Sequence, residues 1–235
     1  MKKHLLFIFA ALLPLLGSAQ TKVEIDGIWY NLVSMAKVAE VTFKGDSFDS
    51  YNEYSGSITI PATVTYEGVT CSVKNIGDEA FRRCRSLTAI TIPVGLTSIR
   101  YSAFYGCSRL TTIVLPKSVN SIGYKAFANC SELTDVYCNA EEIPYTDTKA
   151  FHESNIENAT LHVPASAVNE YKNTAPWSSF GNIVALTDEE MGVEQLTIDN
   201  ARITIYDLHG RRVATPTKDG IYIVDGKKVM VKIGM

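Results

Sequence analysis

The sequence has few of the residues and none of the short motifs that commonly carry catalysis. Its 235 residues include four histidines, and none of them stands in an H-E-x-x-H metal motif. There is also no G-x-S-x-G nucleophile turn and no glycine-rich phosphate loop. A thiol-based active site would need Cys138 as the nucleophile and His152 and His162 as bases, but no motif supports that grouping. We therefore expect a protein that is not an enzyme.

Grouped metal ligands are equally scarce. No C-x-x-C pair is present, which argues against a structural zinc site. The polar stretch 44–53 offers several oxygen atoms, but it lacks the D-x-D-x-D-G spacing of a calcium loop. We expect a solvated loop there, and no cofactor.

The five cysteines are an odd number for a chain built on disulfides. Cys84, Cys107 and Cys130 share one position of a sequence repeat, and we expect them to be buried thiols, since free cysteine is among the most buried residue types. Cys71 and Cys138 fall outside that column, and the sequence leaves open whether they pair. The interpretation we favour is mostly reduced, structural cysteines.

Clusters of basic residues are absent as well. The formal net charge is −3 and charged residues make up 20% of the chain, so a nucleic-acid partner is not expected. Hydrophobic residues make up 46%, which supports a packed core and argues against disorder.

One long apolar run is present, at the N-terminus. Met1–Lys3 is basic, Leu5–Leu16 is apolar, and Gly17–Ala19 offers a small-residue cleavage site, which is the pattern of a signal peptide. The run is shorter than the roughly 20 residues that a spanning helix needs. We expect cleavage after Ala19, no membrane span in the mature chain, and no lipid anchor, because no cysteine follows the cleavage site.

Three stretches repeat one pattern at a spacing of 23 residues: Ile76–Ser98, Ile99–Ser121 and Ile122–Pro144. Each contains Ala-Phe, then Cys, then Leu at fixed intervals, followed by a short apolar run. A strict period of this length means stacked units that cannot bury their apolar faces alone, which predicts a solenoid.

The alternation Ile90-Thr91-Ile92 within the first copy predicts one short strand per repeat, ended by Pro93. Parallel stacking would align equivalent residues into columns. A fourth, degraded copy carries Ala150-Phe151 and then Leu161-His162-Val163-Pro164, with Ser154 in place of the cysteine. We expect two further columns to be core: Ala80, Ala103 and Ala126, and Phe81, Phe104 and Phe127.

The pattern Ile76-Gly77-x-x-Ala80-Phe81-x-x-Cys84-x-x-Leu87-x-x-Ile90-x-Ile92-Pro93 resembles the BspA-type leucine-rich repeat family of bacterial surface proteins. The likeness extends upstream to Ile58-Thr59-Ile60-Pro61 and downstream through Tyr171, Trp177 and Phe180 to Val184. The pattern departs from the family where Arg100 and Tyr101 stand in place of the glycine that leads the other copies, and the asparagine ladder of other leucine-rich repeats is absent. The resemblance implies a mainly β leucine-rich repeat solenoid with a small C-terminal β module.

Beyond Ala185 the chain is acidic and weakly patterned up to Asn200, which predicts a linker. Asp225-Gly226 then separates two alternating runs, a strong hairpin signal. Residues 205–213, 220–223 and 228–232 resemble the C-terminal sorting modules of type IX secretion, although this module is shorter than the full domain. The resemblance implies a contact with the secretion machinery through residues 201–235, or else a β-cap that no longer sorts.

The expected organisation follows from these patterns. Within the N-terminal cap we expect strands over 25–39 and 40–43, and a small hairpin at Glu67-Gly68. The predicted units are a signal peptide at 1–19, an N-terminal cap at 20–75, three regular repeats at 76–144, a degraded repeat and closing cap at 145–186, a linker at 187–200 and a β module at 201–235.

What remains as a functional surface is the outward face of the strands. Aromatic side chains dominate interface energetics, so Tyr137 is the strongest single candidate. Tyr101, Tyr105 and Tyr124 lie in or near the repeat turns and form a second candidate patch. The predicted partner-binding columns are Ala89, Thr112 and Asp135, and Thr91, Val114 and Tyr137.

The resemblance implies a secreted or cell-surface protein, outside the outer membrane. The first hypothesis is a non-enzymatic adhesion module that binds a protein or glycan on host or neighbouring cells. The alternative is a structural or accessory envelope protein without a host ligand.

Overall fold

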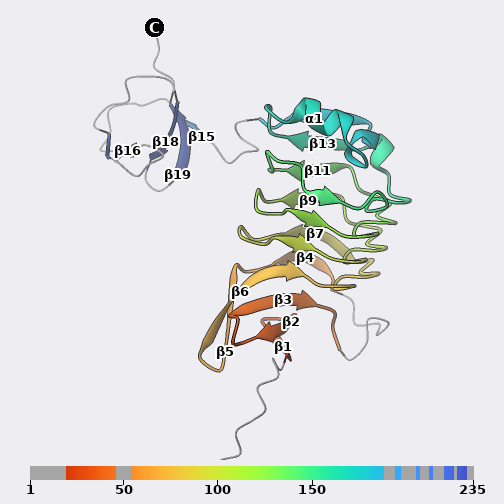
Figure 1. The fold of residues 1–235 in the computed structure, drawn as a ribbon, viewed down its shortest axis with the longest axis vertical. Helices are drawn as coiled ribbons and strands as arrows, with labels where there is room; N and C mark the ends of the chain where they lie inside the picture. The colour runs from red at the N-terminus through yellow and green to blue at the C-terminus, as the bar shows by residue number, and fades with distance from the viewer. Residues whose placement is uncertain are drawn as a thin grey trace, which may run out of the picture.

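The structure is a computed structural model that describes residues 20–45 and 54–187, together with the backbone of five strands between residues 194 and 231. The predicted signal peptide at 1–19 and most of the polar stretch 44–53 lie outside the described residues. Residues 20–45 and 54–187 form one solenoid, in which the copies stack one above another (Figure 1).

The longest strands of the copies form a six-stranded parallel sheet on one side of the solenoid, which we call the front sheet (Figure 1). Each copy contributes one short strand to it, as the repeat pattern predicts. The sheet begins before residue 76, within the segment expected to be cap. In spatial order its strands are β4 (Gly56–Thr59), β7 (Leu87–Thr91), β9 (Thr112–Leu115), β11 (Asp135–Cys138), β13 (Thr160–Val163) and β14 (Asn182–Ala185).

A second sheet runs along another side of the solenoid, built from the start of each copy. Its repeat strands are only two residues long, too short for an alternating pattern to reveal them in the sequence. They continue a larger N-terminal sheet in the order β1–β2–β3–β6–β8–β10–β12, with β5 paired to β6. The strands are β1 (Thr21–Ile25), β2 (Ile28–Val33), β3 (Val38–Thr42), β5 (Thr63–Tyr66), β6 (Val69–Ile76), β8 (Ser98–Ile99), β10 (Ser121–Ile122) and β12 (Tyr145–Thr146).

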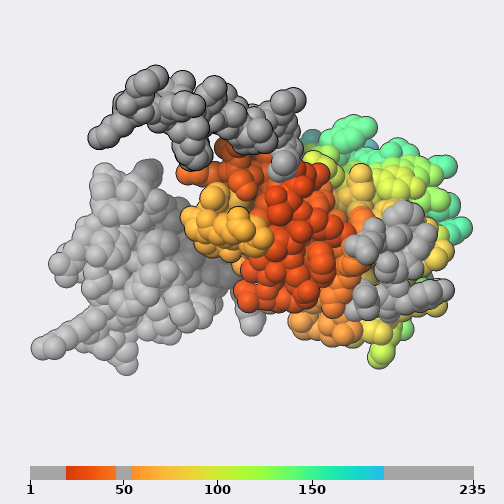
Figure 2. Space-filling model, turned by 90° about the horizontal axis from the view of Figure 1, so that it is seen from below, coloured from red at the N-terminus to blue at the C-terminus, as the bar shows by residue number. Residues whose placement is uncertain are grey.

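The N-terminal strands close one end of the stack, and in Figure 2, seen from that end, their atoms lie at the centre of the described surface. The expected division into strands at 25–39 and 40–43 is wrong. Asp26 and Gly27 have φ of 51° and 81°, which makes a tight turn between β1 and β2, and Lys37 (φ 52°) ends a second turn before β3. The hairpin at Glu67-Gly68 is confirmed, with φ of 47° and 78°.

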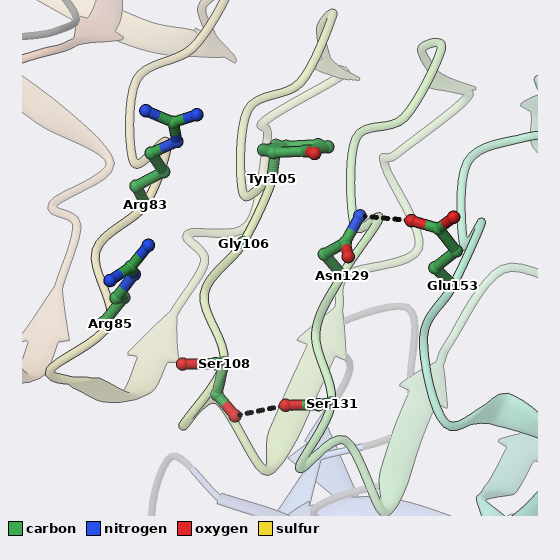
Figure 3. A pocket seen from close by; sticks show the side chains of 8 residues that line it. All are labelled: Arg83, Arg85, Tyr105, Gly106, Ser108, Asn129, Ser131 and Glu153. Atoms are coloured by element: carbon green, nitrogen blue, oxygen red, sulfur yellow. Dashed lines mark hydrogen bonds between the residues drawn. The ribbon is translucent and has the colours of Figure 1, made fainter.

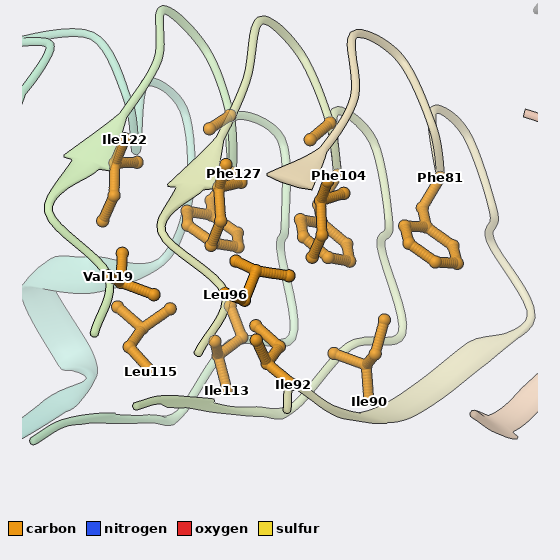
Figure 4. Close-up of a cluster of buried hydrophobic side chains, with 14 of the residues drawn as sticks. Phe81, Ile90, Ile92, Leu96, Phe104, Ile113, Leu115, Val119, Ile122 and Phe127 are labelled. Atoms are coloured by element: carbon orange, nitrogen blue, oxygen red, sulfur yellow. The ribbon is translucent and has the colours of Figure 1, made fainter. Parts of the chain in front are cut away.

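The core is a set of columns that run the length of the stack (Figure 4). Phe81, Phe104 and Phe127 are fully buried, and their rings stack with centroids 5.0 and 5.1 Å apart. The alanine column expected beside them is buried too. Offset stacking at this spacing adds about 0.5–1.5 kcal/mol per pair beyond the burial of area.

Backbone hydrogen bonds join the turn that follows each two-residue strand to the corresponding turn of the next copy. The N–H of Phe81 donates to the carbonyl of Ala103 at 2.7 Å, and Phe104 repeats this with Ala126 at 2.7 Å. Each of these turns contains residues in a left-handed conformation, four positions apart, such as Glu79 and Arg83. The N–H groups of Glu79, Phe81 and Arg83 all donate to the next copy. One such column is Arg83 (φ 57°), Gly106 (φ 73°), Asn129 (φ 59°) and Glu153 (φ 58°).

The cysteine column donates hydrogen bonds to buried backbone carbonyls of the preceding copy. The Cys107 thiol donates to the carbonyl of Phe81 at 3.0 Å, and the Cys130 thiol donates to that of Phe104 at 3.4 Å. In the degraded copy Ser154 makes the equivalent bond to Phe127 at 2.5 Å. The substitution of serine for cysteine therefore keeps the donor, and all five cysteines are free thiols in the structure.

Gly77 lies against the N-terminal cap, next to Glu40, and the residue at the equivalent position of the next copy, Arg100, pairs with the same Glu40. A Cβ at Gly77 would lie 2.8 Å from Oε1 of Glu40 and 2.9 Å from the carbonyl of Val41. Without that Cβ, Nη1 of Arg100 reaches Oε2 of Glu40 at 2.6 Å. Burial raises the pKa of Glu40, and the Arg100 guanidinium opposes that shift.

The C-terminal end of the stack is closed by helical turns: η1 (Ile156–Asn158), α1 (Val168–Asn173) and η2 (Trp177–Ser179). Trp177 and Phe180 pack edge-on against Phe151, with centroids 5.4 and 5.3 Å away, and so end the phenylalanine column. No helix in residues 20–45 and 54–187 is both long and apolar enough to cross a membrane.

A separate five-stranded sheet follows, in the order β15–β19–β18–β16–β17. β18 and β19 pair antiparallel across Asp225-Gly226, in agreement with the predicted hairpin. β15 lies inside the predicted linker 187–200, and it pairs in parallel with β19. The strands are β15 (Glu194–Leu196), β16 (Ile205–Tyr206), β17 (Arg212–Val213), β18 (Gly220–Val224) and β19 (Lys227–Val231).

The native protein is expected to leave its thiols unreactive toward a chromogenic disulfide reagent in mildly alkaline buffer. All five are buried, and burial raises the pKa of Cys130 to about 12 and also raises that of Cys138, so little reactive thiolate exists. Five equivalents should react after unfolding in guanidinium. Stoichiometric reaction of the folded chain, or a deficit after unfolding, would contradict the reduced and buried arrangement.

Replacing Cys107 separates hydrogen bonding from packing. Cys107→Ala should lower the free energy of unfolding by about 1–3 kcal/mol, because it opens a small cavity and leaves the buried Phe81 carbonyl with one donor fewer. Cys107→Ser should cost less, because its hydroxyl can donate as Ser154 does. Urea unfolding midpoints measure both, and equal losses for the two variants would mean that the thiol acts by packing alone.

Candidate functional site

The front sheet brings the predicted partner-binding residues into two straight columns. In one, Ala89 pairs with Thr112 and Thr112 with Asp135. In the other, Thr91, Val114 and Tyr137 stand in register. Their side chains point outward because the alternate residues Ile90, Ile113 and Val136 are buried in the core.

Both columns continue beyond the residues chosen from the sequence. The first extends through Thr160 to Asn182, and the second through His162 to Val184. At the other end the columns begin with Ser57 and Thr59 on β4. The outward face therefore spans six strands rather than three.

The side chains on this outward face are small or medium in size, and few of them are charged. Val114 is 42% exposed and contributes an aliphatic side chain to the outward face. Thr91 is exposed, while Ala89, Thr112, Asp135 and Tyr137 are half-buried.

Tyr137 is held in place by its neighbours. Its ring stacks on that of His162, with centroids 4.2 Å apart and planes 18° from parallel. Nε2 of His162 in turn lies 3.2 Å from Oδ1 of Asp135. A rigid aromatic side chain loses little conformational entropy on binding, which favours such a position as an anchor.

His162 was missed as a member of this face, although its position in the degraded copy gave the signal. Leu161-His162-Val163 aligns with Val136-Tyr137-Cys138, which puts His162 directly after Tyr137 in the outward column. In the structure this part of the degraded copy forms the strand β13.

The structure does not bring together a thiol and two histidines. Cys138 faces the core, where its Sγ lies 3.2 Å from the hydroxyl of Tyr171. His162 is on the outward face of the same sheet, and His152 lies in a turn with its Nε2 3.5 Å from Oε1 of Glu153. In residues 20–45 and 54–187 no three acidic, histidine or cysteine side chains are grouped so as to hold a metal ion.

The turn side carries a second feature, a polar hollow of about 320 Å³ (Figure 3). Of the three tyrosines expected near the turns, Tyr105 lines this hollow, while Tyr101 and Tyr124 stack on each other elsewhere with centroids 5.8 Å apart. The residues that line it are Arg83, Arg85, Tyr105, Gly106, Ser108, Asn129, Ser131 and Glu153.

Comparison with solved structures finds bacterial leucine-rich repeat proteins. A leucine-rich repeat protein from Bacteroides ovatus ATCC 8483 is 27% identical over 74% of this chain, with a TM-score of 0.48. This chain spans 43% of the length of that protein. The T. pallidum leucine rich repeat protein is 22% identical, covering 60% of this chain and 71% of its own, with a TM-score of 0.46.

The pneumococcal vaccine antigen PcpA is 16% identical, covering 72% of this chain and 48% of its own, with a TM-score of 0.44. Comparison with curated proteins gives no match. The family model described as the BspA type leucine rich repeat region matches residues 48–174, with six copies. Because this match spans more than half of the chain and coincides with the observed stack of copies, the protein belongs to the BspA-type leucine-rich repeat family.

Proposed function

We propose that this protein is exported and acts at the cell surface as a non-enzymatic binding module, whose front sheet contacts a protein or glycan on host or neighbouring cells. The observation that carries the proposal is the pair of outward columns, which present a regular surface across six strands. Repeat solenoids generally use such extended faces for recognition.

The chemistry of the face suits a flat partner surface. Its side chains are short and mostly uncharged, so little desolvation of charge opposes contact. Val114 and the ordered Tyr137 supply apolar area near the middle of the sheet, where buried anchors contribute most to affinity. Asp135 and His162 place a polar pair beside that anchor.

A paired substitution on the face tests the proposal. Tyr137→Ala with Thr91→Lys removes the aromatic anchor and adds a charge in the same column, so binding of the full chain to extracellular-matrix proteins, host glycans or envelope fractions should weaken about tenfold or more. Solid-phase binding measures the loss. Val114→Lys alone should weaken binding without disturbing the stacked Tyr137 and His162 rings.

A matched variant controls for the chemistry of the change. Tyr145→Ala with Val94→Lys makes the same kinds of change at exposed residues outside the front sheet, and binding should survive it. If the folded protein captures nothing from the panel, the adhesive role fails and a structural envelope role takes its place.

The C-terminal five-stranded sheet serves as the export and attachment signal in this proposal. Support comes from the resemblance of residues 205–213, 220–223 and 228–232 to type IX sorting modules, and from the antiparallel pairing of β18 with β19. Deletion of residues 201–235 should leave the protein in the periplasm of a bacterium that has this secretion system. Fractionation with surface proteolysis measures its location, and unchanged surface display would reject the sorting role.

A further inference from the structure

The polar hollow on the turn side is produced by a missing side chain. Arg83, Gly106, Asn129 and Glu153 occupy one left-handed column, and Gly106 is the member without a Cβ. Successive copies lie about 4.8 Å apart, so the side chains of Arg83 and Asn129 stand roughly 10 Å apart with open space between them. The stem of Arg83 lies beside this gap, since a Cβ on Gly106 would be 3.5 Å from its Cγ.

Positive charge is concentrated at one end of the hollow. Arg83 and Arg85 come from the same copy and line the same side of it (Figure 3). Both are exposed, and neither has an ion-pair partner among the described residues. Two guanidinium groups side by side offer many N–H donors in a planar geometry that matches a carboxylate or a sulfate.

The other sides of the hollow offer hydroxyl and amide groups. Nδ2 of Asn129 donates to Oε2 of Glu153 at 3.0 Å, which fixes the amide and leaves its oxygen available as an acceptor. The Ser131 hydroxyl donates to the carbonyl of Ser108 at 3.3 Å, and both serines line the floor. Such a set pairs with the hydroxyl groups of a sugar.

Tyr105 supplies the one aromatic surface. The Arg82 guanidinium carbon lies 5.5 Å from the centroid of its ring, and Arg82 is itself paired with Glu79 at 2.6 Å. Figure 3 shows the ring edge-on, between the arginine side and the Asn129 side of the hollow. An apolar sugar face packs well against a ring held in this way.

We infer that this hollow binds an acidic saccharide, with its anionic group at Arg83 and Arg85 and its sugar ring over Gly106 between Tyr105 and Asn129. The volume of about 320 Å³ is at the lower end of ligand pockets, which suits a short saccharide rather than a folded partner. The site lies on the turns that lead into the front sheet and not on the outward columns of that sheet, and it does not depend on the proposed function of those columns.

The decisive variant is Gly106→Asn. Asparagine already occupies the same left-handed position in the next copy, at Asn129, so the backbone accepts it there. Its side chain fills the hollow while every charge stays in place. Arg83→Gln with Arg85→Gln removes the anion site and keeps the space. Lys117→Gln with Lys172→Gln removes the same charge from exposed residues that do not line the hollow.

Isothermal titration of the full chain with digalacturonic acid, a sulfated heparin disaccharide and neutral lactose tests the inference. At least one acidic disaccharide should bind saturably and lactose should not. Binding of digalacturonic acid would show that a carboxylate suffices, whereas binding of the heparin disaccharide alone would show that the sulfate is needed. The double arginine variant should weaken binding about 10- to 100-fold, the loss expected for charge-assisted contacts. Gly106→Asn should weaken it by a similar factor for another reason, because its side chain occupies the space of the sugar ring. The lysine variant should bind like the unmodified chain.

Three results would overturn the site: no saturable binding by either acidic disaccharide, equal binding of lactose, or acidic binding that survives Gly106→Asn. The last result would mean a general attraction of the arginines for anions. Because Gly106→Asn leaves the front sheet unchanged and Tyr137→Ala leaves the hollow unchanged, loss of one activity is distinguishable from loss of the other.

Discussion

The constraint on which this structure depends is that each copy must hydrogen-bond to the next in register on every side. On the turn side, N–H groups such as that of Phe81 donate to the following copy. Along the short strands the direction is reversed, and Arg100 donates to the carbonyl of Ile76 in the preceding copy. A backbone held by both sets of bonds cannot slip, so equivalent side chains are forced into columns.

The columns then determine what each side of the molecule can do. Inside, identical phenylalanine rings stack, and the thiols of Cys107 and Cys130 meet carbonyls that would otherwise be buried with fewer donors. Outside, a column need not be uniform, because solvent tolerates any side chain there. The front sheet and the turns can therefore differ from copy to copy while the core repeats.

The phenylalanine column also shows how a repeating core is brought to an end. At the N-terminal end Tyr54 packs on Phe81 with centroids 4.8 Å apart, and its hydroxyl donates to the carbonyl of Thr42 at 2.9 Å. At the other end Trp177 and Phe180 meet Phe151 at steep angles instead of stacking in parallel. A change of ring angle leaves no flat face for another copy.

The sequence was sufficient for everything that the 23-residue period controls. It predicted the solenoid, the buried columns, the outward positions of Thr91 and Tyr137, and the Glu67-Gly68 hairpin. It could not predict β8 and β10, because two residues carry no alternation. The hollow at Gly106 was not predicted either, since it arises from one side chain missing within a turn column, and the neighbouring copies must be placed in space before the gap is seen.

The register between copies is uneven, and this has a consequence for how the chain can change over time. Ser98 aligns with Ser121 after 23 residues, whereas Asp135 aligns with Thr160 after 25. The regular copies are therefore interchangeable units, while the last one is fitted to its closing cap. Duplication of a regular copy would lengthen the stack by one rung without changing the contacts of the closing cap.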